Sequence, residues 1–221
     1  MVSALALQTL PNQRAGSACP MIDLFLSLIL AADQVVLDNE YVHVTRSASW
    51  CAAANTPDCG FRVIVALDDL VLAGAGSSQR MTRGDVAVFQ PDESYEPPAS
   101  SAFIEVAIKP NHPPAQFPTA TIAPQKNALC YDGKDFFVFE ERLAPGDTRP
   151  RHSHSERVVI QLNQTRLRQW PDGGDVLLIE TTPERVSFNS PVVHAVQNVG
   201  DTPLRGIVIE FKPGLVGTTS K

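Results

Sequence analysis

Apolar residues along the chain gather in short runs that are rich in β-branched side chains and bounded by turn residues. Such runs are "RVIVA" at 62–66, "FIEVAI" at 103–108 and "GIVIEF" at 206–211, and such boundaries are "GAGSS" and "PDGG". Runs of this length predict strands, and clusters of Gly, Pro, Asp and Ser predict the turns between them. No segment between the first strand and the last predicts a long helix. The pattern therefore predicts an all-β fold.

The strand pattern occurs twice. A shift of 95 residues aligns residues 39–72 with residues 134–167 without a gap, and an insertion in the second copy then brings residues 83–91 onto residues 183–191. Both copies close on a strand followed by Lys-Pro, "FIEVAIKP" and "GIVIEFKP". Two copies of one β unit are the simplest explanation of this self-similarity.

A proline-rich stretch, residues 111–127, separates the two copies. Proline has no N–H to donate to a sheet and disfavours helix, so this stretch is predicted to be an extended connector. We therefore expect an N-terminal repeat over residues 36–110 and a C-terminal repeat over residues 128–221. Residues 1–35 precede both repeats as a secretory signal or an N-terminal extension.

The N-terminal segment contains a nearly uncharged apolar run, "MIDLFLSLILAA" at residues 21–32. It is similar to the apolar core of a secretory signal, although it carries Asp23 and the only basic residue upstream is Arg14. A helix packed on the domain and a retained anchor are the alternatives, and the run is too short to span a bilayer. We expect secretion or a periplasmic location, with the cytoplasm as the alternative, and no membrane span in the mature protein.

The charge pattern excludes one class of partner. The net charge is −6 over 221 residues, and Lys and Arg form no runs, so no nucleic-acid partner is expected. Phosphate-binding loops, a nucleophile elbow and a C-x-x-C pair are also missing from the sequence. An Arg-Gly-Asp tripeptide at 83–85 is predicted to be a turn and not an adhesion motif.

The four cysteines leave the redox compartment open. Cys51 and Cys59 lie in a loop-like stretch and could close a small disulfide, or all four cysteines could be free thiols. Cys19 and Cys130 have no obvious partner.

Three of the five histidines are the candidates for chemistry. In a strand, His152 and His154 would project on one side about 7 Å apart, which is a spacing for two ligands of one metal. His194, in the apolar run "PVVHAVQN", is the candidate third ligand. His43 is predicted to be a packed or surface residue, and His112 is predicted to be exposed in the connector.

These residues resemble the two motifs of the cupin superfamily. The first motif has a glycine, H-x-H and a glutamate, and the second has a proline, a histidine and an asparagine. The matching residues are Gly146, His152, His154, Pro191, His194 and Asn198. The resemblance covers both repeats and implies a bicupin, that is, two antiparallel β-barrels of the jelly-roll type.

The sequence also departs from those motifs. The glutamate would stand at position 158 or 159, and both positions are valine. Glu156 shares a face with His152 and His154 if strand alternation holds, so it could be a fourth metal ligand or a catalytic acid or base. The alternative is a solvated loop residue.

The N-terminal repeat is not expected to bind a metal. Its positions matching His152 and His154 are Pro57 and Cys59, and the position matching His194 is Ser94. One sulfur without neighbouring imidazoles does not make a comparable site. The N-terminal barrel is expected to pack against the other barrel or to shape one wall of its mouth.

A divalent metal held by three neutral imidazoles keeps its full charge, which favours a small anionic substrate. Imidazole suits iron, zinc and nickel, and manganese is also considered. Arg149, Arg151 and Arg157 could bind a carboxylate, but alternation turns Arg151 and Arg157 away from the histidines, and Arg62 at the matching position hints at a structural role for Arg157.

The resemblance to iron cupins favours a dioxygenase. A non-redox isomerase, lyase or hydrolase with Glu156 as base is the alternative, and so is a non-catalytic binding module. The exposed barrel faces make a homodimer reasonable.

Overall fold

The computed structural model describes residues 34–74, 77–98, 102–111 and 126–212. Within these ranges every element of regular secondary structure is a β-strand, and the strands form four sheets. The all-β fold predicted from the apolar pattern is therefore confirmed. The segment 21–32 that was interpreted as a signal, Cys19, and the connector residues 112–125 with His112 lie outside the described residues. No helix in the described part of the chain is long and apolar enough to cross a membrane.

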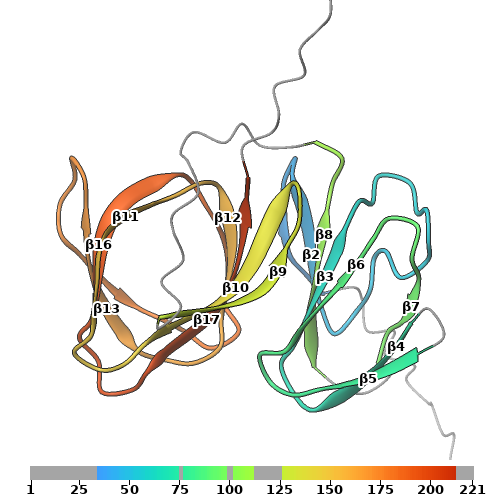
Figure 1. Cartoon of the computed structure of the whole chain (residues 1–221), viewed down its shortest axis with the longest axis horizontal. Coiled ribbons are helices and arrows are strands. Elements are labelled where there is room, and N and C mark those ends of the chain that lie inside the picture. The colour runs from blue at the N-terminus through green and yellow to red at the C-terminus, as the bar shows by residue number, and fades with distance from the viewer. Residues whose placement is uncertain (1–33, 75–76, 99–101, 112–125, 213–221) are drawn as a thin grey trace, which may run out of the picture. The chain divides into compact units, whose positions relative to one another are not determined.

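We assign the first eight strands to the N-terminal repeat, where they form a five-stranded and a three-stranded sheet (Figure 1, blue to green). The five-stranded sheet has the order β1 (Gln34–Asp38), β2 (Val42–Arg46), β8 (Phe103–Ile108), β3 (Arg62–Ala66) and β6 (Val86–Phe89). The three-stranded sheet has the order β5 (Ser77–Met81), β4 (Leu70–Gly74) and β7 (Tyr95–Glu96). The interior between the two sheets is filled by Ile64, Ala66, Leu70, Leu72, Met81, Ala87, Tyr95 and Phe103.

The remaining nine strands form the second barrel (Figure 1, yellow to red). Its five-stranded sheet has the order β15 (Val186–Asn189), β12 (Arg157–Gln161), β17 (Leu204–Phe211), β10 (Phe136–Leu143) and β9 (Asn127–Asp132). Its four-stranded sheet has the order β11 (Thr148–His154), β16 (Val192–Asn198), β13 (Arg166–Pro171) and β14 (Leu177–Glu180). Neighbouring strands are antiparallel throughout, as in β10 and β17.

The largest hydrophobic core lies between the two five-stranded sheets. It joins alternate residues of β2, β3 and β8 with alternate residues of β10, β12 and β17. Both faces of these sheets are consequently buried, which explains why β3 and β8 are apolar without interruption. Along β12, Val158 and Ile160 point into this shared core, whereas Arg157, Val159 and Gln161 line the interior of the second barrel.

Arg62 and Arg157 have the same structural role in the two repeats. Nη1 of Arg62 donates to the carbonyl oxygen of Gln90 at 2.6 Å, and Nη1 of Arg157 donates to that of Ser190 at 3.0 Å. The repeat alignment pairs Gln90 with Ser190 as well. Each arginine therefore ties the start of its strand to the end of the neighbouring strand, as the sequence repeat suggested.

Glu184 links the two barrels. Arg46 of β2 donates from Nη1 to its carboxylate at 2.7 Å and from Nη2 to its carbonyl oxygen at 2.8 Å, and Nη1 of Arg83 lies 3.4 Å from the same carboxylate. Glu184 has a φ of 64°, and the aligned residue of the first repeat is Gly84, with a φ of 94°. The second repeat thus keeps a side chain at a position that favours glycine, because this side chain contacts the first barrel.

The Arg-Gly-Asp tripeptide at 83–85 is part of this contact. Asp85 accepts a hydrogen bond from the Thr82 amide at 2.7 Å, which closes a turn, and Arg83 donates to the carbonyl oxygens of Leu67 and Leu162. The tripeptide is therefore a turn whose arginine reaches the second barrel.

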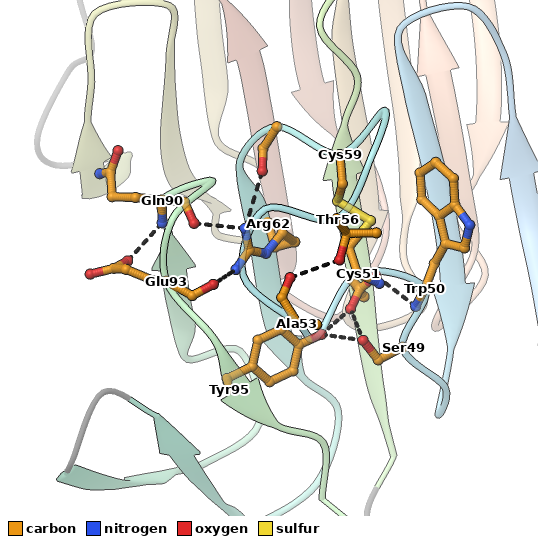
Figure 2. Close-up of a disulfide and its surroundings, with 12 residues drawn as sticks. Ser49, Trp50, Cys51, Ala53, Thr56, Cys59, Arg62, Gln90, Glu93 and Tyr95 are labelled. Atoms are coloured by element: carbon orange, nitrogen blue, oxygen red, sulfur yellow. Dashed lines mark hydrogen bonds between the residues drawn. A yellow bond between two sulfur atoms is a disulfide. The ribbon is translucent and has the colours of Figure 1, made fainter.

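Cys51 and Cys59 form a disulfide in the loop that precedes β3 (Figure 2). Beside it, the amides of Trp50 and Cys51 donate to one oxygen of the buried Glu105, and Ser49 donates to the other at 2.5 Å. Tyr95 also bonds Glu105 and lies 2.8 Å from the Ser49 hydroxyl. The disulfide therefore closes the loop on itself, and the carboxylate of Glu105 holds the loop to the interior of the first barrel. Cys130 is a free thiol.

Candidate metal centre

The structure brings His152, His154 and His194 together. The first two lie on β11 and the third on β16, and these strands pair so that His152 is directly opposite His194. One ligand atom from each imidazole lies within 4.8 Å of the other two. The three ring centroids are 4.6 to 5.4 Å apart. The described residues thus contain one cluster that could hold a metal, made of the three histidines expected from the sequence.

Each imidazole is oriented by an acceptor at its Nδ1. The acceptor is the Pro150 carbonyl oxygen for His152 (2.8 Å), Glu210 for His154 (2.7 Å) and the Gln169 amide oxygen for His194 (3.3 Å). Carbonyl oxygens only accept, and so does the ionised Glu210 carboxylate. With Glu210 ionised, Nδ1 of each ring therefore carries the proton and Nε2 carries a lone pair. All three rings are thereby set in the tautomer that binds a metal through Nε2.

The Nε2 atoms fit a bound cation. Nε2 of His152 and His154 are 2.9 Å apart. Two nitrogen ligands that bind one metal at right angles, with bonds of about 2.1 Å, are about 3.0 Å apart. With both Nδ1 atoms protonated, no proton lies between these lone pairs, and Nε2 of His194 is buried without a hydrogen-bond partner among the described residues. A cation would satisfy all three atoms.

Burial keeps the three histidines neutral. It lowers the pKa of His154 to about 3 and that of His194 to about 2, with further lowering by Arg157, and it also lowers the pKa of His152. Metal binding requires the neutral imidazole, so the site is ready to bind at neutral pH. Burial also raises the pKa of Glu210 to about 7, although the amide of Ser155 stabilises its charged form.

Glu156 is not part of the histidine cluster. The chain bends at residue 156, between β11 and β12, so strand alternation does not continue from the histidines to this residue. Its carboxylate is buried, with Oε2 lacking a partner among the described residues. Tyr41 packs against the shared core, and its pKa is raised mainly by a hydrogen bond to Glu40 and burial, with a contribution from the charge of Glu156. The group of converging ligand atoms therefore contains the three histidines and does not contain Glu156.

The same bend changes the interpretation of the arginines. Arg157 lines the interior cavity together with His154, although alternation predicted that it faces away. Arg151 is exposed and pairs with Asp172 outside the site, as expected. Arg149 is buried and forms an ion pair with Glu141, with 2.7 Å between Nη1 and Oε1.

The remaining motif residues shape the backbone around the site. Gly146 has a φ of 82°, a left-handed conformation that favours glycine, and its amide donates to the Asn198 carbonyl oxygen. The Asn198 side chain donates to the carbonyl oxygens of Leu143 and Thr202, both at 2.8 Å. Both residues therefore fix the turns beside β11 and β16.

A cavity of about 230 Å³ extends from the histidines through the second barrel. Its charged lining residues balance, because Arg157 and Arg185 are opposed by Glu141 and Glu180. The other lining residues are His154, Val159, Gln161, Leu167, Gln169, Ile179, Thr181, Ser187, Asn189, His194, Val196 and Val208. A dipositive metal held by three neutral imidazoles would leave this cavity net positive.

Sequence reasoning missed Glu210, Gln169 and Glu141. Glu210 is the lone acidic residue in the apolar run "GIVIEF", which is a signal for a buried, paired carboxylate. Gln169 and Glu141 lie in ordinary mixed runs and carry no comparable signal. All three lie on strands other than the one that carries the H-x-H motif.

Comparisons with known proteins identify the fold. No protein-family model and no curated protein matches the sequence. A protein from Pseudomonas aeruginosa described as glyoxylate-induced has a similar structure, with a TM-score of 0.56, 13% identity and coverage of 84% of this chain and 80% of that one. An oxalate decarboxylase has a TM-score of 0.54 and 11% identity, with coverage of 83% and 76%. An IolB-like protein from Salmonella typhimurium has a TM-score of 0.50 and 16% identity, with coverage of 79% and 84%.

These similarities extend over both barrels and are structural. The oxalate decarboxylase and the glyoxylate-induced protein, both with TM-scores above 0.5, are cupin proteins. The chain therefore has the cupin fold in its two-barrel form, which confirms the fold that the two motifs predicted. At these identities the comparisons establish the fold alone.

Proposed function

We propose that this chain, with its two-barrel cupin fold, is a metal-dependent enzyme that acts on a small anionic organic molecule inside its second barrel. The observation that carries the proposal is the convergence of three imidazoles beside a cavity, each oriented by a hydrogen bond at Nδ1. The name of one structural neighbour, an oxalate decarboxylase, shows that the fold can serve an enzyme of a small anion.

His152, His154 and His194 would hold the metal, which supplies Lewis acidity and, as iron, the ability to activate dioxygen. We propose dioxygenase chemistry as the first reaction class, because three protein ligands leave positions for a substrate and dioxygen together. Arg157, whose Nη1 is held by the carbonyl oxygens of Ser155 and Ser190, adds a fixed positive charge beside His154. Its role is to attract the anionic group and orient it toward the histidines.

The middle of the cavity limits the access of water. Apolar side chains face it from both sheets, and they are Val159, Leu167, Ile179, Val196 and Val208. Exclusion of water strengthens the electrostatic interactions between a bound anion and the charged end of the cavity.

A non-redox reaction is the second candidate, and the position of Glu141 favours it. This carboxylate lines the cavity and is paired with Arg149, and its charge acts on the pKa of His152 and His154. In an isomerase, lyase or hydrolase, Glu141 would hold and return the proton. It takes the role that the sequence suggested for Glu156.

Metal content tests the proposal. We would purify the protein without chelator or affinity-tag metal, and measure metals by elemental analysis beside a His152→Ala, His154→Ala double variant and a His43→Ala control. About one metal per chain is expected in the unaltered protein and in the control, and none in the double variant. Negligible metal in all three proteins would overturn the proposal.

The identity of the metal then chooses between the reaction classes. Iron directs the screen to oxygen uptake with small carboxylates, whereas zinc, nickel or manganese directs it to isomerisation, lyase and hydrolysis assays. A bound metal without turnover in either screen would indicate a non-catalytic binding module.

A further inference from the structure

The cavity of the second barrel has three chemically different levels. On β12 they are Arg157, Val159 and Gln161. The first two have neighbours on β15 and β17, and Gln161 has a neighbour on β17. Asn189 and Glu210 stand opposite Arg157, and Ser187 and Val208 stand opposite Val159. At the third level, Gly206 stands opposite Gln161, and the Gln161 amide donates to the Arg185 carbonyl oxygen at 3.0 Å. The cavity thus runs from the histidine end to Gln161 and Arg185.

The first and third levels are far apart. Gln161 is four residue steps from Arg157, which is about 13 Å along β12. The second level between them is mainly apolar, and its one hydroxyl, that of Ser187, already accepts a hydrogen bond from Asn189 at 3.1 Å. A ligand that uses both ends must therefore be elongated and apolar in its middle.

The third level has polar groups without partners. Oε1 of Gln161 is buried and makes no hydrogen bond with any described residue. A side chain at Gly206 would meet this atom, because a Cβ there would lie 3.5 Å from it. The described residues also give the Arg185 guanidinium no ion pair or hydrogen bond, although Arg185 lines the cavity. Oε1 of Gln161 only accepts hydrogen bonds, so the groups at this level that can donate to a carboxylate are the Gln161 Nε2 group and the Arg185 guanidinium.

The backbone of Arg185 is held in place. Its amide donates to the Thr182 carbonyl oxygen, and its carbonyl accepts from Gln161. The preceding residue, Glu184, is fixed by Arg46 of the first barrel. Arg185 therefore extends from a rigid turn at an exposed end of the cavity.

The acidic residues of the lining do not compensate Arg185. Glu141 is paired with Arg149 at 2.7 Å. Glu180 is exposed and accepts a hydrogen bond from the Gln164 side chain at 2.8 Å, and it forms no ion pair with Arg185 among the described residues. The positive charge of Arg185 is therefore available to a ligand.

From this arrangement we infer that the cavity binds an unbranched aliphatic dicarboxylate, with one carboxylate at the histidine end and the other between Arg185 and Gln161. The inference rests on the proposed function, because it specifies the substrate class of the same metal site. The apolar second level accommodates the methylene chain, and Arg185 selects for the second carboxylate.

The test compares glutarate with pentanoate, which has the same chain length and only one carboxylate. We would measure both affinities by isothermal titration calorimetry on the full chain, metal-loaded and chelator-treated, with succinate and adipate to define the preferred length. Glutarate is expected to bind the metal-loaded protein about tenfold more tightly than pentanoate, because a charged hydrogen-bonded pair at the far end is then satisfied. Arg185→Gln should remove this preference, whereas Arg168→Gln, an exposed arginine on the outer face of β13, should keep it.

Any of three outcomes would overturn the inference. They are equal affinities for glutarate and pentanoate, no detectable binding of any dicarboxylate, and an unchanged preference in Arg185→Gln. The metal content of the same samples separates this failure from a failure of the proposed function. If the protein takes up metal but does not prefer dicarboxylates, only the inference is overturned. A protein that takes up no metal overturns the proposed function, and the effect of Arg185→Gln on the preference is still measurable in it.

Discussion

The two barrels share one repeat pattern, but their interiors differ. The first is filled by large apolar side chains and by the network around Glu105, whereas the second contains a cavity lined by His154 and His194. The repeat aligns Cys59 with His154, and the closing Lys-Pro strands align Ala107 with Glu210. In the first barrel, Cys51, Cys59 and Ala107 pack together in one cluster.

The difference shows that a metal ligand and the residue that orients it change together. His154 needs an acceptor for its Nδ1 proton, and Glu210 supplies it. Where the histidine is replaced by Cys59, a carboxylate at position 107 would be buried without that partner, which is unfavourable. Cys59 stands at the repeat position of His154 and closes its loop through the disulfide with Cys51.

The largest effect is expected from removing this disulfide. A Cys51→Ser, Cys59→Ser double variant should lower the free energy of unfolding by about 2.5 kcal/mol, because the unfolded chain regains the entropy of a short closed loop. Urea denaturation measures this loss, and Cys130→Ser, which changes an exposed free thiol, is the control. The metal content should not change. A loss of metal in the double variant would show that metal binding in the second barrel depends on the disulfide of the first.

The second comparison uses the two buried glutamates. Glu210→Gln should weaken metal affinity by about tenfold or more, because His154 loses the carboxylate that sets its tautomer. Competition with a chromophoric chelator measures the affinity. Glu105→Gln makes the same change inside the first barrel and should leave the metal affinity unaltered. Equal effects of the two substitutions would contradict the assignment of Glu210 as the residue that orients His154.

Much of the candidate site could be predicted from the H-x-H motif in the sequence. Strand alternation correctly put His152 and His154 on one face, and the second motif identified His194. Alternation failed for Glu156 and Arg157, because the bend at residue 156 separates β11 from β12, which belong to different sheets. A local pattern does not report where a strand leaves its sheet.

The residues that orient the histidines could not be predicted from local sequence patterns. Glu210 is 56 residues away from His154 in the sequence, and Gln169 is 25 residues away from His194. Only the pairing of β12 with β17, and of β13 with β16, brings them to the site. The all-β fold was predictable because it depends on short apolar runs, whereas these contacts depend on sheet order.

A smaller effect is expected at the contact between the barrels. Glu184→Gln removes the charge that Arg46 and Arg83 share, and these partly exposed ion pairs should contribute about 0.5 to 1 kcal/mol at low salt. Urea denaturation at low and high salt measures this effect, which should shrink as salt screens the charges. Glu184→Gly is the matched variant, because it loses the same contacts but relieves the left-handed backbone, as Gly84 does in the first repeat. It should be the more stable of the two, and the reverse order would contradict the strain at this position.

The smallest effect is expected from the ionisation of Glu105. Burial raises its pKa, and the hydrogen bonds from Ser49 and from the amides of Trp50 and Cys51 oppose this shift. The folded state therefore binds this proton more readily than the unfolded state. The contribution of Glu105 to stability is present below the ordinary carboxyl pKa and is lost as the pH rises through the folded-state value.

Glu105→Gln removes this pH dependence. Urea denaturation between about pH 4 and about pH 8 should show the variant gaining stability relative to the unaltered protein as the pH rises. Glu96→Gln, at an exposed glutamate of β7, should show no such gain, and a parallel pH dependence of the two variants would contradict the proposed ionisation of the first barrel's interior.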